Sequence, residues 1–249
     1  MVTLQEIKDK EKTGKSYWSH SQRFRHQLGY PITKLILKTP LTANMITVFW
    51  IIQQIIGASL LLYGTYLTML AGVTIFNLSF VLDAVDGQIA RFRQKITYTG
   101  YYLDKIGHWA GTPALFVALG IGTFIKTDQI IFTILGLAIA FLHLLIELID
   151  FNGFWSWCDT SRYPAEGKIL LKQTYQGFRV SALAQKNWVT KYIFAFFKRG
   201  QLLNVLFLGV LLDVPQLALI LYFMLFSLKF IFKLTRQIQS LKKIDDKLS

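Results

Sequence analysis

The chain has 249 residues, of which 53% are hydrophobic and only 16% are charged. A soluble domain of this length usually carries about a quarter charged residues. The apolar residues here come in long blocks, so the composition argues against a soluble globular protein and for a membrane protein. The single cysteine, Cys158, excludes an internal disulfide framework.

The formal net charge of +13 is compatible with a nucleic-acid partner or with an anionic membrane. The basic residues lie between apolar blocks and form no nucleic-acid motif. We therefore expect no nucleic acid, and a membrane lipid surface as the partner of these charges.

The N-terminal segment is polar but rich in large apolar side chains. Residues 3–38 mix Lys, Arg and His with Leu, Ile, Phe, Tyr and Trp, a composition typical of amphipathic helices in a membrane interface; a solvated tail is the alternative. The first 30 residues lack the apolar core and cleavage site of a secretory signal. We therefore divide the chain into an interfacial segment, 1–44, a membrane catalytic domain, 45–235, and a basic tail, 236–249.

Six apolar segments are long enough to cross a bilayer, which takes about 20 residues. They are Met45–Tyr63, Tyr66–Leu82, Leu103–Ile125, Ile130–Ile149, Tyr192–Leu212 and Gln216–Phe232. The fifth is the weakest, because Lys198 and Arg199 interrupt it. The predicted fold class is all-α: a polytopic integral membrane protein with six transmembrane helices and an N-terminal interfacial amphipathic helix. Residues 151–190 are expected to form a second interfacial excursion.

The basic residues are distributed very unevenly over the two faces that these spans define. Of the 27 Lys and Arg residues, all but Lys126 fall on one face. Because Lys and Arg favour cytoplasmic loops, this asymmetry predicts that both termini and the loop 87–100 are cytoplasmic. An even number of spans agrees with that arrangement.

Three aspartates and a histidine are spaced to meet at this cytoplasmic face. Asp83 and Asp86 are three apart, on one helical face at the end of the second span. Asp104 and His108 are four apart, at the start of the third span. A short loop joins the two helices, so the four side chains are predicted to converge.

Converging carboxylates at membrane depth repel one another unless a cation binds them. Oxygen ligands favour Mg²⁺ or Mn²⁺ over Zn²⁺. Gly87 leaves room for a ligand near the backbone, and Arg91, one turn on, supplies a cation for a phosphate. The residues alone therefore predict a metal-dependent diphosphate site that faces the cytoplasm.

The stretch from residue 83 to residue 108 also resembles the signature of the CDP-alcohol phosphotransferase family, D-x2-D-G-x2-A-R-x8-G-x3-D-x3-D. Seven of its eight fixed positions match with the right gaps. They are Asp83, Asp86, Gly87, Ala90, Arg91, Gly100 and Asp104. Upstream, the segment with Asn44 and Thr47 loosely resembles the entry of this family to its first span, although Pro40 is displaced.

The resemblance implies transfer of a substituted phosphate from a CDP-linked donor to an acceptor alcohol, with release of CMP. Asp83, Asp86 and Asp104 would bind one or two Mg²⁺ or Mn²⁺ ions. The CDP site would be lined by Gly87, Ala90, Arg91 and Gly100, with Asn44 and Thr47 near the nucleotide. The donor would be CDP-diacylglycerol or a small CDP-alcohol, one substrate would be a lipid or lipid-linked, and a homodimer is expected.

His108 stands where the family signature has its last aspartate, the residue expected to act as general base and to help hold a second metal. A neutral imidazole is a competent base, so we predict His108 and Asp104 as catalytic residues. As a ligand, His108 removes one negative charge, which predicts weaker binding of a second ion. The alternative is a catalytically silent relative that binds nucleotide or lipid. A transporter with an acidic pathway is less consistent, since no internal repeat is present and the acids cluster at one face.

Other polar residues lie near the predicted site. His143, Glu147 and Asp150 share one helical face of the fourth span. Glu147 is expected to contact the acceptor or a cationic head group, or to hydrogen-bond His108, unless this is a solvated helix end. His20 and His26 are interpreted as ordinary surface histidines.

Overall fold

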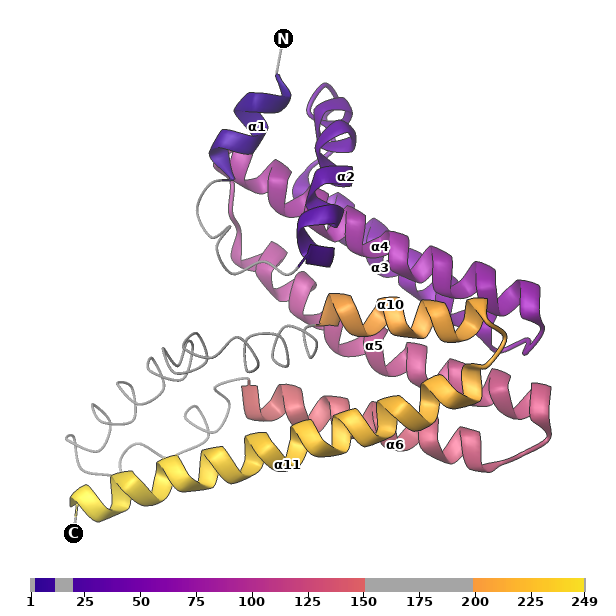
Figure 1. Cartoon of the computed structure of the whole chain (residues 1–249). Coiled ribbons are helices and arrows are strands. Elements are labelled where there is room, and N and C mark those ends of the chain that lie inside the picture. The colour runs from indigo at the N-terminus through magenta and orange to yellow at the C-terminus, as the bar shows by residue number, and fades with distance from the viewer. Residues whose placement is uncertain (1–2, 12–19, 151–198, 249) are drawn as a thin grey trace.

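The computed structural model describes residues 3–11, 20–150 and 199–248, and every element within them is a helix (Figure 1). The helices are α1 (Leu4–Lys10), α2 (His20–Ile36), α3 (Ala43–Leu61), α4 (Tyr66–Phe92), α5 (Tyr98–Thr127), α6 (Ile131–Asp150), α10 (Arg199–Leu211) and α11 (Pro215–Leu248). The all-helical class expected from the sequence is therefore found throughout the described residues.

Five of these helices are long and apolar enough to cross a membrane: α3, α4, α5, α6 and α11. The sixth predicted span, Tyr192–Leu212, falls partly outside the described residues. Its described part, α10, has 13 residues, which is too short to cross a bilayer alone. The predicted interfacial excursion over residues 151–190 also lies outside the described residues.

Three threonines define where the central helices begin. Thr42, Thr65 and Thr97 are the N-cap residues of α3, α4 and α5, and each side chain accepts a hydrogen bond from the backbone N–H three residues on. Such caps satisfy an N–H group that has no partner within the helix. The start predicted for α4, Tyr66, agrees with the structure, whereas α3 and α5 begin two and five residues before their predicted starts, at Ala43 and Tyr98.

The helices form a bundle in which α3 and α4 lie side by side, α5 packs against α3, and α11 runs along α6 (Figure 1). The main core is built from fully buried side chains of six helices, among them Leu61, Phe76, Leu115, Leu119, Ile139, Leu206 and Tyr222. Large apolar side chains such as Phe49, Leu67 and Phe141 are exposed on the outside. Such a surface suits a lipid environment better than water.

Glycines allow α3 and α4 to approach backbone to backbone. A Cβ atom built on Gly57 would lie 2.8 Å from the carbonyl oxygen of Gly72, and one built on Gly72 would lie 2.6 Å from that of Gly57. Small residues at such crossings are a common device of membrane helices. The close α3–α4 contact fixes the distance between the site residues on α3 and those on α4.

We expect Gly57→Ala to destabilise the bundle, because the added methyl group must push the two backbones apart. Overpacking of this kind costs about 1–3 kcal/mol. Thermal unfolding in detergent should show a lower midpoint than the parent. Ser59→Ala on the same helix, where the side chain is exposed, is the control and should leave the midpoint nearly unchanged.

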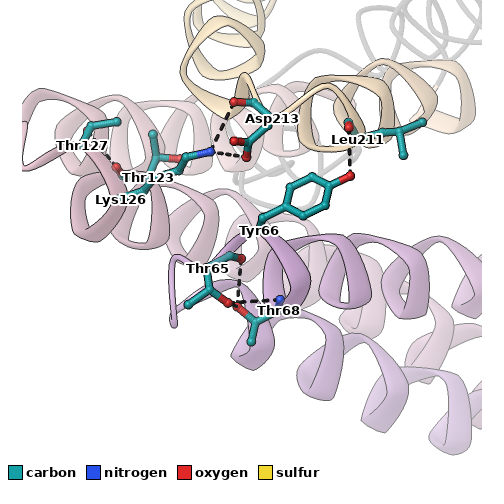
Figure 2. Close-up of polar contacts among 8 residues, drawn as sticks. All are labelled: Thr65, Tyr66, Thr68, Thr123, Lys126, Thr127, Leu211 and Asp213. Atoms are coloured by element: carbon teal, nitrogen blue, oxygen red, sulfur yellow. Dashed lines mark hydrogen bonds and ion pairs between the residues drawn. The ribbon is translucent and has the colours of Figure 1, made fainter.

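The end of the bundle remote from the motif is held together by polar contacts (Figure 2). Lys126 of α5 forms an ion pair with Asp213 in the turn between α10 and α11. Tyr66 of α4 donates a hydrogen bond to the carbonyl of Leu211 at 3.2 Å. Lys126 is the one basic residue that the sequence predicts on the non-cytoplasmic side, and it is paired with an acid.

The N-terminal helices pack against the opposite end of α4 (Figure 1). Thr33 of α2 donates a hydrogen bond of 2.6 Å to Gln88 of α4, and both side chains are buried. The outer face of α2 leaves Phe24 and Leu28 exposed, as an interfacial helix would. The inner face places α2 over the last turns of α4, where the motif lies.

Candidate functional site

A cavity of about 370 Å³ opens between α2, α3, α4 and α5. It is lined by His26, Ala43, Asn44, Thr47, Asp83, Ala84, Asp86, Gly87, Ala90, Arg91, Lys95, Ile96, Thr97, Gly100, Tyr101 and Asp104. Every site residue predicted from the sequence lines this cavity except His108. Acidic side chains come from α4 and α5, and basic ones from α2, α4 and the loop after α4.

Asp83, Asp104 and His108 form a cluster suited to a metal ion. One ligand atom from each lies within 4.8 Å of the other two. Nε2 of His108 is 3.5 Å from Oδ1 of Asp104 and 3.7 Å from Oδ1 of Asp83. Two carboxylates and one imidazole at this spacing fit a divalent cation, and the oxygen-rich set favours Mg²⁺ or Mn²⁺.

Asp86 lines the same cavity but is held by α3. Its Oδ2 accepts hydrogen bonds from Oγ1 of Thr47 at 2.7 Å and from Nε1 of Trp50 at 2.8 Å. Trp50 is completely buried, and a Cβ atom at Gly107 would lie 2.4 Å from its ring. Thr47 therefore orients a motif carboxylate, and Trp50, which sequence reasoning missed, does the same from within the core.

His108 lies behind the two aspartates and does not line the cavity. Its ring lies 5.1 Å from that of Trp50 and is stacked on Phe80 at 5.8 Å, measured between ring centroids. Its side chain is 12% exposed, and Nδ1 has no hydrogen-bond partner among the described residues. Nε2 is therefore the ring nitrogen that the fold presents to the acidic cluster.

Asn44 and Gly100 meet where α3 and α5 begin. Oδ1 of Asn44 accepts a hydrogen bond of 3.3 Å from Oγ1 of Thr97. A Cβ atom on Gly100 would lie 2.5 Å from the same Oδ1. A side chain at Gly100 would therefore displace Asn44 from the cavity wall, which explains why this position takes glycine.

Two buried charged residues from the N-terminal helices reach the site, and the sequence did not indicate either. Oε1 of Glu11 is 2.9 Å from Nη2 of Arg91 and 2.7 Å from Nδ1 of His26. Burial raises the pKa of Glu11, but hydrogen bonds from His26 and Tyr30, together with the charges of His26 and Arg91, outweigh burial and keep that pKa below its usual value. The carboxylate is thus held in its charged form.

Arg25 is the second of these residues. It is 9% exposed, and its guanidinium lies 4.8 Å from the centre of the Phe80 ring. Burial lowers the pKa of Arg25 to about 10, while the negative charge of Asp83 opposes that shift. A positive charge is therefore placed beside the acidic cluster by α2.

The structure corrects the interpretation of His26 and places Glu147 in the part of the chain that it describes. His26 is not an ordinary surface histidine, since it lines the cavity and contacts Glu11. Glu147 does not line the cavity; its Oε2 accepts a hydrogen bond of 3.3 Å from Trp109, and its Oε1 lies 3.9 Å from His143. This hydrogen bond joins α5 to α6 one residue after His108.

A family model described as CDP-alcohol phosphatidyltransferase matches residues 40–199, which is more than half of the chain. The apo crystal structure of phosphatidylinositol phosphate synthase from Mycobacterium tuberculosis is similar, with a TM-score of 0.57 at 19% identity, over 84% of this chain and 94% of that one. At this identity the likeness shows a shared fold. Curated proteins yielded no significant match.

Proposed function

The chain belongs to the CDP-alcohol phosphatidyltransferase family, and from that premise we propose that it transfers a substituted phosphate from a CDP-linked donor to an acceptor alcohol, releasing CMP. The observation that carries the proposal is the convergence of Asp83, Asp86 and Asp104 with Arg91 on one cavity. Acids that can hold a divalent cation and a guanidinium that can contact a phosphate are the parts that a diphosphate substrate requires.

In this proposal Asp83, Asp86 and Asp104 hold one or two Mg²⁺ or Mn²⁺ ions, with His108 near enough to be a further ligand. A divalent cation held there would neutralise negative charge on the diphosphate and on the departing CMP. Thr47 and Trp50 keep Asp86 oriented through their hydrogen bonds. Gly87, Ala90, Arg91 and Gly100 line the CDP site, with Asn44 beside the nucleotide.

His108 is proposed as the base that accepts the proton of the acceptor hydroxyl, with Asp104 as its partner. Nε2 lies close to two carboxylates, and their charges would stabilise the imidazolium that forms. The same nitrogen cannot accept a proton while it is bound to a metal. The base and ligand roles of His108 are therefore separate hypotheses that experiment can distinguish.

One divalent ion is expected to bind tightly, and a second weakly or only with nucleotide. The three motif aspartates carry three negative charges, and Arg25 beside Asp83 returns one positive charge. Because His108 replaces the last carboxylate of the family signature, less negative charge is left to hold a second divalent cation. Calorimetric titration with Mn²⁺, with and without CDP, measures the number of ions bound.

Two tight ions in the absence of nucleotide would contradict this charge argument. Arg25→Gln supplies a sharper form of the same test. Removing the guanidinium leaves one more uncompensated negative charge, so the variant is expected to bind the second ion more tightly than the parent.

The position of the substrates follows from the same topology. We propose that the cavity and both termini face the cytoplasm, a placement supported by the asymmetry of Lys and Arg. One substrate is a lipid or lipid-linked: either CDP-diacylglycerol with a small acceptor, or a small CDP-alcohol with a lipidic acceptor. A homodimer is proposed from the family resemblance.

The decisive experiment is to follow CMP release by the purified protein with each class of CDP donor, in the presence and absence of Mg²⁺ or Mn²⁺. Metal-dependent release supports the transferase. Because His108 departs from the family signature and does not line the cavity, a silent nucleotide-binding relative is the second candidate. CDP binding without CMP release from any donor would favour it.

A further inference from the structure

Glu11 is a buried carboxylate that reaches the cavity wall from the end of the N-terminal helix α1. Its side chain is 2% exposed and contacts Arg91 and His26, both of which line the cavity. An unpaired buried carboxylate would be costly, whereas one that is hydrogen-bonded to a histidine and paired with an arginine is tolerated. The geometry therefore couples a residue outside the family motif to the motif arginine.

The guanidinium of Arg91 occupies space that the missing side chain of Gly87 leaves free, and Glu11 holds it there. A Cβ atom on Gly87 would lie 3.1 Å from both Nη1 and Nη2 of Arg91. Glu11 accepts a hydrogen bond from the same Nη2 at 2.9 Å. An arginine side chain otherwise has about 2 kcal/mol of rotamer entropy to lose when it is ordered. Here that ordering is achieved before any substrate arrives.

Neighbouring contacts dock α1 on the last turn of α4. Nζ of Lys10 donates a hydrogen bond of 3.0 Å to the carbonyl of Phe92 and lies 4.3 Å from the centre of the Phe92 ring. Ile7 is 2% exposed. Phe92 directly follows Arg91, and Lys10 directly precedes Glu11. The contacts of Lys10 with Phe92 therefore hold the Glu11 carboxylate beside the Arg91 guanidinium.

We propose that Glu11 is a positioning residue for donor binding: its carboxylate holds the Arg91 guanidinium beside Gly87, where it can contact a phosphate of the CDP-linked donor. This inference rests on the proposed function. It makes the N-terminal helix a part of the substrate site. Removing the charge of Glu11 would also remove its repulsion of a substrate phosphate. Arg91 lines the cavity and Glu11 does not, so we expect the loss of guanidinium ordering to have the larger effect.

The test is CDP binding in the presence of Mn²⁺, measured by calorimetry on full-length protein. Glu11→Gln is expected to weaken binding about tenfold, which corresponds to about 1.4 kcal/mol. It should raise KM for the donor more than it lowers kcat. Glu11→Asp, which keeps the charge on a shorter side chain, should lose less. Glu6→Gln on the same helix, exposed and still able to cap it, is the control and should bind CDP as the parent does.

A double-mutant cycle separates positioning from general damage to the fold. If Glu11 acts through Arg91, then Glu11→Gln combined with Arg91→Ala should bind CDP no more weakly than Arg91→Ala alone. Additive losses would overturn the inference, as would unchanged or tighter CDP binding by Glu11→Gln. A parent protein that binds CDP and releases CMP while Glu11→Gln is unaffected refutes only the positioning role. A parent that does neither refutes the proposed function and this inference with it.

Discussion

Asparagine in place of Asp83, Asp86 or Asp104 is expected to abolish turnover of the CDP-linked donor, while each variant still inserts and purifies. Asparagine keeps the shape of the side chain but removes the charge that holds a divalent cation. Losing even the partner of a metal ligand costs roughly 10–100-fold in affinity or activity, so loss of a ligand should cost more than roughly 100-fold.

The three variants are expected to fail for different reasons. Asp83 and Asp104 belong to the metal cluster with His108, so their variants should also bind Mn²⁺ poorly. Asp86 is anchored by Thr47 and Trp50, so its variant should in addition loosen the contact between α3 and α4. CMP release, Mn²⁺ titration and thermal unfolding together measure these effects.

Asp128→Asn is a matched control for the aspartate series. Asp128 is exposed at the C-terminal end of α5, far along that helix from Asp104, and its φ of 57° suits asparagine equally well. This variant should retain the activity of the parent. Near-normal turnover in both Asp83→Asn and Asp104→Asn would refute the metal hypothesis.

His108→Ala is expected to lose most activity but to keep CDP binding, because the three aspartates and Arg91 remain. A positioned general base typically contributes about 10²–10⁴-fold to the rate. If the variant instead loses Mn²⁺ affinity in proportion to its activity, His108 is a metal ligand rather than the base. Turnover equal to that of the parent across the pH range would exclude both roles.

His108→Asp restores the family signature and provides the discriminating comparison. An imidazole base must be neutral to accept a proton, whereas an aspartate base stays ionised to lower pH. This variant should therefore retain measurable activity, with the acidic limb of its rate profile moved to lower pH. Loss of activity alone could come from disturbed packing against Phe80 and Trp50, so the shift of the limb is the informative result.

The sequence by itself determined the features that depend on local spacing. Apolar segments of sufficient length predicted the helices α3, α4, α5, α6 and α11, because a bilayer requires that length whatever the tertiary contacts are. Intervals of three and four residues placed Asp83 with Asp86, and Asp104 with His108, because side chains at those intervals share a face of any α-helix. The short loop between α4 and α5 then predicted that the two pairs meet.

Only the tertiary structure decided which distant residues join them. Glu11 lies 80 residues from Arg91 along the chain, and Trp50 lies 36 residues from Asp86. No spacing rule relates such positions, since their meeting depends on how α1, α2 and α3 dock on α4. The packing of the helices also places His26 at the cavity and brings Glu147 within hydrogen-bond distance of Trp109. Helical periodicity states which face a side chain occupies, but the packing of helices determines what that face meets.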